Sequence, residues 1–146
     1  MKKFKFSMES LLNLKLSLEN KKKEELGHAI TLLKLEKDKL FQLENKRNNV
    51  IDLYKKGSKD KIFVLELKNY NNYLLFIKKT IEEQLLIIKK AEINVEQKRE
   101  EFINATKERK ILDKLKEKHY ENYLYEVKQE EQKIVDEIVS YNYSNQ

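Results

Sequence analysis

The chain contains no proline and only two glycines, Gly27 and Gly57, among its 146 residues. These residue types supply most tight turns, so a chain with so few of them cannot make the many reversals that a β-rich or mixed fold requires. Charged residues make up 38% of the chain, and glutamate, lysine and aliphatic residues at this level are typical of long helices and coiled coils. The sequence therefore predicts an all-α protein.

Two long segments carry a seam at alternating three- and four-residue spacing, which is the rhythm of a two-stranded coiled coil. The first helix is predicted at about 8–56 and the second at about 61–141, with a turn at about 57–60 that includes Gly57. A short link between two long helices makes them antiparallel neighbours. We predict a single coiled-coil domain, 1–146: a long two-helix antiparallel coiled-coil hairpin with the C-terminal helix longer than the N-terminal helix.

The seams can be written residue by residue. The first helix has its predicted seam at Met8, Leu12, Lys15, Glu19, Lys22, Leu26, Ala29, Leu33, Glu36, Leu40, Leu43, Arg47, Val50 and Tyr54. The second has Phe63, Leu67, Tyr70, Leu74, Ile77, Ile81, Gln84, Ile88, Ala91, Val95, Lys98, Phe102, Ala105, Arg109 and Leu112. Past Lys116 the pattern slips and resumes as Tyr120, Leu124, Val127, Ile134, Ile138 and Tyr141.

The predicted turn also predicts which seam residues face each other. Facing residue numbers should add to roughly 117, with shifts of seven as the alternatives because the heptad pattern repeats. This register sets Leu43 by Leu74 and Glu19 beside Lys98. The first helix then reaches no further than residue 109 of the second, which leaves about thirty residues, or roughly 45 Å, of a single helix unpaired.

Charge is unevenly distributed along the 105–139 segment that includes this overhang. Its first third is basic, with Lys107, Arg109, Lys110, Lys114, Lys116 and Lys118. Its last third is acidic, with Glu126, Glu130, Glu131, Asp136 and Glu137. A lone helix that also exposes Ile134 and Ile138 needs another molecule to cover it. We therefore expect this helix to bind a partner.

The residues for catalysis or cofactor binding are missing, so we predict that the protein is not an enzyme and uses no cofactor or metal. His28 and His119 fall on different helices and read as surface or seam-edge residues. The two glycines stand alone, so there is no phosphate-binding loop, and the chain has no cysteine. The carboxylates alternate with lysines on solvated faces, where they stay ionised.

The sequence also limits where the protein can be located and which class of partner it can bind. Its longest apolar runs, such as 74–77 and 85–88, are too short for a transmembrane segment, and the basic N-terminus is a poor secretion signal. We expect a cytoplasmic protein, or one peripheral at the cytoplasmic face of the cell membrane. The net charge is +6, but nearly all of the positive charge is lysine interleaved with glutamate. Because arginine is the residue for bidentate phosphate recognition, no nucleic-acid partner is expected.

Two sets of residues near the ends of the chain form distinctive patterns. The first is Phe4 and Phe6 before the pair Leu11 and Leu12. The second is the closing run Ala105, Arg109, Leu112, Leu115-Lys116-Glu117-Lys118, followed by Tyr120, Glu126 and Asp136-Glu137. Both patterns resemble the flagellar type III export protein family FliJ, and length, helical character and lysine-rich composition agree with the resemblance across the whole chain.

The resemblance implies a coiled-coil stalk similar to the central stalk of rotary ATPases. Its implied partners are a hexameric export ATPase, the cytoplasmic domain of an export-gate membrane protein, and substrate chaperones. Residues predicted to bind the ATPase ring are Arg109, Lys110, Lys114, Lys116, Lys118, Tyr120, Asp136 and Glu137. Residues predicted by analogy to contact the gate protein are Tyr54, Tyr70 and Tyr73.

Two other classes of protein fit parts of the sequence. One is a generic coiled-coil adaptor or chaperone, including the stalk of a non-flagellar injectisome, which would have the same helical pattern. The other is a helical protein that binds a membrane surface or nucleic acid through its basic amphipathic start, residues 1–18.

Overall fold

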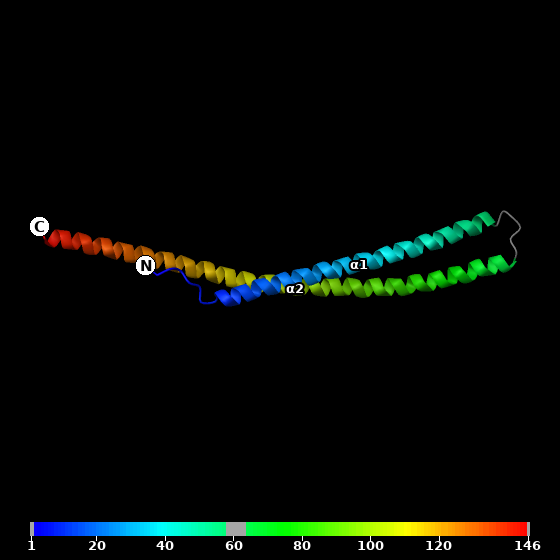
Figure 1. Ribbon diagram of the computed structural model, residues 1–146, viewed down its shortest axis with the longest axis horizontal. Helices are drawn as coiled ribbons and strands as arrows, with labels where there is room; N and C mark the ends of the chain where they lie inside the picture. Colours follow the sequence, from blue (N-terminus) through cyan, green and yellow to red (C-terminus); the bar gives the residue numbers. More distant parts are fainter. Residues whose placement is uncertain (1, 58–63, 146) are drawn as a thin grey trace. The chain divides into compact units, whose positions relative to one another are not determined.

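The computed structural model describes residues 2–57 and 64–145, which form two helices packed against each other (Figure 1). Helix α1 spans Glu9–Gly57 and α2 spans Val64–Ser144, with 49 and 81 residues respectively. The predicted all-α fold with a longer C-terminal helix is confirmed. Gly57 is the last residue of α1, and the remainder of the predicted turn, together with the seam residue Phe63, lies outside the described residues.

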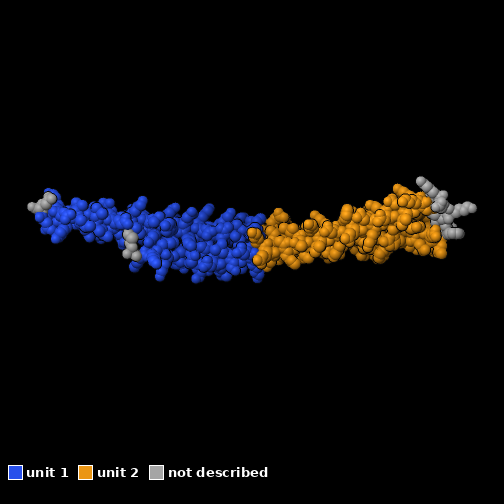
Figure 2. Space-filling view, turned by 45° about the horizontal axis from the view of Figure 1, so that its top comes forward, with its two compact units in different colours: residues 1–21, 102–146 blue, residues 22–101 orange. Residues whose placement is uncertain are grey.

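The chain divides into two compact units, each built from one segment of each helix (Figure 2). Unit 1 combines Met1–Lys21 with Phe102–Gln146, and unit 2 is Lys22–Glu101. A pair of helices buries one line of contacts in each unit, and that line is the seam. The single domain suggested by the sequence stays a prediction.

The observed seam follows the predicted one closely. Every predicted seam residue that the structure describes is buried or half-buried up to Leu112, with the exception of Met8. In unit 2 the best-buried seam residues are Ala29, Ile77, Ile81, Gln84, Ile88 and Val95, and in unit 1 they are Leu12 and Leu112. Burial of this apolar line holds both helices in place, because in proteins most of the stability of a helix comes from packing of its apolar face rather than from helix propensity.

The register differs from the predicted one by a single heptad. The rings of Tyr54 and Tyr70 meet at 6.2 Å in unit 2, and Leu12 packs in one cluster with Leu112 in unit 1, so facing residue numbers add to 124 in both units. The predicted sum of 117 is therefore wrong, and the alternative shift of seven is correct. Both registers place seam on seam, so periodicity could not distinguish them; the specific polar pairs do.

Those polar pairs also correct the predicted neighbour of Glu19. Its Oε2 accepts a hydrogen bond from Arg109 Nε at 2.8 Å, in place of the expected contact with Lys98. In unit 2, Lys98 Nζ instead lies 3.8 Å from Glu25 Oε2. Glu19 and Lys98 thus still meet opposite charges, but on other residues than the expected ones.

A buried polar side chain fixes the register within unit 2. Gln84 is 8% exposed, and its Nε2 donates to the backbone oxygen of Glu36 at 2.9 Å and to Glu36 Oε2 at 2.6 Å. The hydrogen bond from Gln84, followed by one from Lys39, lowers the pKa of Glu36. A heptad shift would leave this amide buried without its partner, which is how single polar seam residues select one alignment.

The predicted slip of the seam past Lys116 does not occur among the buried and half-buried residues of α2. Lys116, His119 and Tyr123 continue the earlier spacing and are half-buried, whereas Tyr120 and Leu124 are exposed. The apolar residues do move by one position in the sequence, but α1 and the residues before it cover the original face.

We expect protonation of the Glu101 carboxylate to account for part of the loss of stability at low pH. Hydrogen bonding from Lys22 at 3.3 Å, with the charges of Lys22 and Lys98, lowers the pKa of Glu101 below its ordinary value of 4.5. A carboxylate with a lowered folded pKa stabilises the fold above its unfolded pKa, and this contribution is lost as the pH falls through the folded value. The melting temperature, followed by circular dichroism, should therefore fall between pH 5 and pH 3, and less steeply in Glu101→Gln than in the unaltered chain. Glu100→Gln, an exposed neighbour, should keep the full slope; equal slopes in all three proteins would contradict this assignment.

Adjacent aliphatic residues of unit 1 offer a test of the seam. Leu112 is 9% exposed and Ile111 is 66% exposed. Leu112→Ala should lower the free energy of unfolding by about 2–4 kcal/mol because it leaves a cavity between the helices. Ile111→Ala should change it by less than about 0.5 kcal/mol. Urea unfolding followed at 222 nm measures both, and similar losses from the two variants would show that the seam lies elsewhere.

Candidate partner-binding surface

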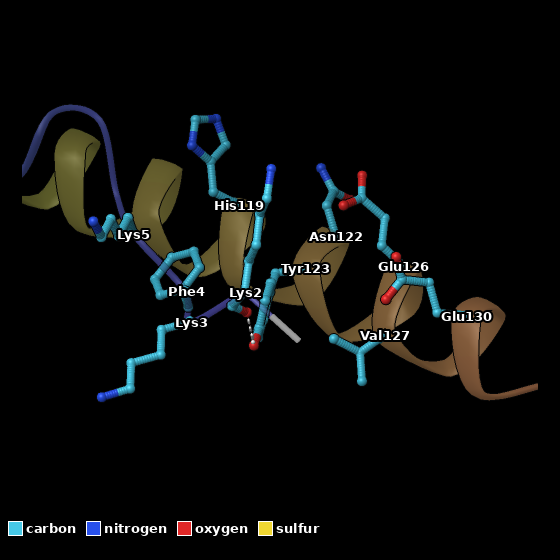
Figure 3. Close-up of a pocket in the computed structure, with 10 residues that line it drawn as sticks. All are labelled: Lys2, Lys3, Phe4, Lys5, His119, Asn122, Tyr123, Glu126, Val127 and Glu130. Carbon is cyan, nitrogen blue, oxygen red and sulfur yellow. Dashed lines mark hydrogen bonds between the residues drawn. The ribbon is translucent and has the colours of Figure 1, made fainter.

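Residues 2–8, which we call the N-terminal strap, precede α1 and lie along α2 within unit 1 (Figure 3). The ring of Phe4 meets those of Tyr120 and Tyr123 at 5.1 Å and 5.5 Å. Phe6 is buried, and its ring stands edge-on to His119 at 5.5 Å. Edge-to-face and tilted ring pairs of this kind add to the stabilisation from burial alone. Two aromatic anchors therefore hold the strap to the helix.

One hydrogen bond fixes the start of the strap. The hydroxyl of Tyr123 donates to the backbone oxygen of Lys2 at 2.8 Å (Figure 3). At its other end the strap turns into α1 through a hydrogen bond from Glu9 N to Phe6 O at 3.1 Å. The strap thus covers a stretch of α2 that α1 does not reach.

A groove of about 1080 Å³ lies between the strap and α2. Basic residues of the strap and acidic residues of α2 both line it, and Figure 3 shows them around one space: Lys2, Lys3, Lys5, Glu126 and Glu130. Ligand pockets are mostly apolar and enclose their ligand. A groove lined by charges of both signs is better suited to a protein segment than to a small molecule.

The predicted basic residues fall into two groups. Arg109 donates from Nε to Glu19 at 2.8 Å and from Nη1 to Asp113 at 2.6 Å, and these hydrogen bonds raise its pKa. Lys116 Nζ lies 2.8 Å from Glu9 Oε2. Both side chains therefore hold unit 1 together and have little charge left for a partner.

The second group is free of such pairs. Lys110, Lys114 and Lys118 are exposed, and none of them forms an ion pair with any residue that the structure describes. They follow one another at four-residue spacing, which puts them on one side of α2. A second groove, of about 530 Å³, brings Lys110 and Lys114 together with Phe4 and Tyr120. The structure thus places the predicted Tyr120 in one groove with three of the predicted lysines, Lys110, Lys114 and Lys116, and with Phe4 of the strap.

Beyond the strap, α2 has no neighbour among the described residues. All residues from Lys128 to Asn145 are exposed, including Ile134 and Ile138 at 56% and 55%. This bare end measures roughly 25 Å at 1.5 Å per residue. It is shorter than the predicted 45 Å because the register moves α1 further along α2 and because the strap covers the next two turns.

The predicted acidic residues lie on this bare end. Asp136 Oδ1 accepts a hydrogen bond from Gln132 Nε2 at 3.0 Å, one turn earlier on the same helix. Glu137 is exposed, on a stretch of α2 that no other described residue covers, and is therefore available to a partner. Both residues belong to unit 1, as do the basic residues above.

The three tyrosines predicted to meet the gate protein lie in unit 2. Tyr54 and Tyr70 are half-buried and contact each other edge to face, while Tyr73 is exposed at 38%. The structure therefore uses two of these rings for helix pairing and leaves one on the surface.

The sequence predicts seam packing for Tyr123 and a surface or seam-edge position for His119, but no contact of either residue with the strap. The spacing of the seam would have predicted that both residues are covered, because further steps of four and three residues from Leu112 lead through Lys116 to His119 and Tyr123. The sequence shows Phe4 and Phe6 as a pattern, but it does not predict their contacts with α2, because the segment that carries them has no periodicity.

The described residues show neither a metal site nor a membrane-spanning helix. No cluster of three or more histidine, aspartate or glutamate side chains among residues 2–57 and 64–145 could hold a metal ion. Over the same residues, neither helix has a stretch apolar enough to cross a membrane.

These features define a class: a two-helix coiled-coil protein whose C-terminal helix continues past its partner. A family model described as "Flagellar FliJ protein" matches residues 4–146, and the chain belongs to the flagellar FliJ family. It is accordingly a component of flagellar export, and a stalk protein rather than an enzyme. A search of curated proteins and a search of solved structures each found no match.

Removing the anchors should release the strap. Phe4→Ala abolishes two ring contacts, and Tyr123→Phe abolishes the hydrogen bond to Lys2, which is worth about 0.5–1.5 kcal/mol. Trypsin should therefore cut after Lys5 severalfold faster in either variant than in the unaltered chain. Tyr125→Phe, two residues away and outside the strap contacts, serves as the matched control. Equal cleavage rates in Tyr123→Phe and Tyr125→Phe would mean that this hydrogen bond does not hold the strap.

Proposed function

We propose that the protein is the stalk of a flagellar export ATPase and that its bare end enters the hexameric ring. The observation that carries this proposal is the bare end itself, where α2 exposes Ile134 and Ile138 and no other part of the chain that the structure describes covers them. Family membership supports an export role, and the bare helix supplies a shape that a ring could surround. We further propose that the protein works in the cytoplasm, at the membrane face where export begins.

The charges on α2 support two kinds of contact with such a ring. Lys110, Lys114 and Lys118 form a basic face without intramolecular ion pairs among the described residues, so they can pair with acidic loops at no cost to the fold. Asp136 and Glu137 would meet basic groups deeper in the ring. Rim charges of this kind steer association and set orientation more than they add affinity. The apolar residues of the bare end supply the affinity.

Contacts with the export-gate protein and with substrate chaperones are proposed on the family resemblance. The exposed Tyr73 is the best candidate for the gate contact, because Tyr54 and Tyr70 already pack against each other. A tyrosine that is partly exposed on a helix gives a partner both an apolar ring and a hydroxyl.

The basic face is tested by charge reversal. The triple variant Lys110→Glu, Lys114→Glu and Lys118→Glu should lose stimulation of the cognate ATPase and bind it at least tenfold more weakly, because six units of charge are reversed on one face. Binding is measured by surface plasmon resonance at two salt concentrations, and stimulation by phosphate release. Reversal of Lys23, Lys34 and Lys37, three exposed lysines of α1, changes the net charge equally and should leave both unchanged. Equal effects from the two triple variants would reduce the contact to net charge and contradict the proposal.

The bare end is tested separately. Ile134→Ala with Ile138→Ala keeps the helix propensity high and removes apolar area that should become buried in the ring. Each buried isoleucine is worth about 1.5–3 kcal/mol, so binding should weaken by well over tenfold while the urea midpoint stays the same. Arg109→Glu provides the contrast, since it should lower the urea midpoint first by breaking the pair with Glu19. Full ATPase binding by the double alanine variant would exclude the bare end as the ring contact.

A further inference from the structure

The outer side of α2 in unit 2, away from α1, carries large apolar residues. Leu75 and Phe76 are 65% and 63% exposed, and Leu86 and Ile93 are comparably exposed. Residues four or fewer positions away, such as Ile77, are buried in the seam. The outer side of a two-helix coiled coil is normally polar because it faces water. Two leucines and a phenylalanine within four turns therefore need a partner.

Around these residues, pairs of apolar residues and pairs of charged residues are placed symmetrically along the sequence. A Leu-Phe pair at 75–76 is followed by a Lys-Lys pair at 78–79, a Glu-Glu pair at 82–83 and a Leu-Leu pair at 85–86. The centre of this arrangement lies between Thr80 and Ile81. We call residues 75–86 of α2 the mirror segment. Its apolar pairs are equidistant from the centre, and so are its charged pairs, but the charges have opposite signs.

We infer that the occupant of this face is a second copy of the chain, with the two mirror segments antiparallel about a two-fold axis. In that arrangement Leu75 lies opposite Leu86 of the other copy, and Lys79 opposite Glu82, because these four residues share the outer face of the helix. Phe76 lies at the edge of this contact. Each contact occurs twice, which is the property of a self-complementary two-fold interface. A parallel arrangement would instead place lysine against lysine.

The charges of the mirror segment are not explained by pairing within the chain. Lys78, Lys79, Glu82 and Glu83 are all exposed, and none forms an ion pair with a residue in the described parts of the chain. Lysine four residues before glutamate is also the less favourable order for support within a helix. No lysine follows either glutamate at three or four residues, where the favourable order would place it. These four charges are therefore better arranged for another copy than for their own helix.

The inference is tested with the full chain by sedimentation velocity over a range of concentrations. The unaltered protein should pass from monomer to dimer as its concentration rises. Lys78→Glu with Lys79→Glu leaves four acidic residues in the segment, and Glu82→Lys with Glu83→Lys leaves four basic ones. Each double variant alone should dimerise at least tenfold more weakly, and an equimolar mixture of the two should recover a dimer. That recovery depends on the antiparallel pairing and not on the stability of either chain.

A matched pair of phenylalanines supplies the control. Phe76 and Phe41 are each 63% exposed and both belong to unit 2, but Phe41 lies on α1. Phe76→Ser should weaken the dimer, whereas Phe41→Ser should not, and circular dichroism should show equal helix content. A monomer at every concentration overturns the inference. So does a dimer that both serine variants weaken equally, or one that the mixed charge variants do not restore.

Discussion

A single line of contacts between two helices carries the stability of each unit. A two-stranded coil has no interior beyond its seam, and none of the described large side chains is completely buried. A residue of α2 that neither α1 nor the strap reaches therefore finds partners, among the described residues, only on α2 itself. This constraint explains why polar seam residues come in pairs such as Gln84 with Glu36, and why exposed apolar residues on α2 cannot be dismissed as a second core.

The seam could be predicted from the sequence because the spacing of apolar residues gives its period, and among the described residues the prediction is correct up to Leu112, except at Met8. The register could not, because a shift of seven residues returns every seam position to another seam position. The pair of Arg109 with Glu19 distinguishes the two alignments, but in the wrong alignment Glu19 also meets an opposite charge, that of Lys98. Periodicity determines the face of a helix, whereas individual hydrogen bonds determine its alignment.

The candidate site was predictable only in part, for the same reason. The sequence shows that the first third of the 105–139 segment is basic, but it does not show which cations are already used. With the observed register, Arg109 and Lys116 are engaged by α1, and Lys110 and Lys114 remain available. The strap has no period, so its position on α2 follows from the burial of Phe6 and could not be read from spacing.

On the bare end of α2 the apolar residues do not occupy the positions that would continue the seam. The seam reaches Tyr123 by regular steps of three and four residues. Continuing those steps passes through Glu126, Glu130, Lys133 and Glu137, of which the last two lie one position before Ile134 and Ile138. A longer α1 in the same register would therefore meet charged side chains rather than isoleucines at this end. The apolar residues of the bare end face another direction than those of the hairpin. They are accordingly suited to a partner that approaches α2 from a different side than α1 does, and self-pairing along the seam does not compete for them.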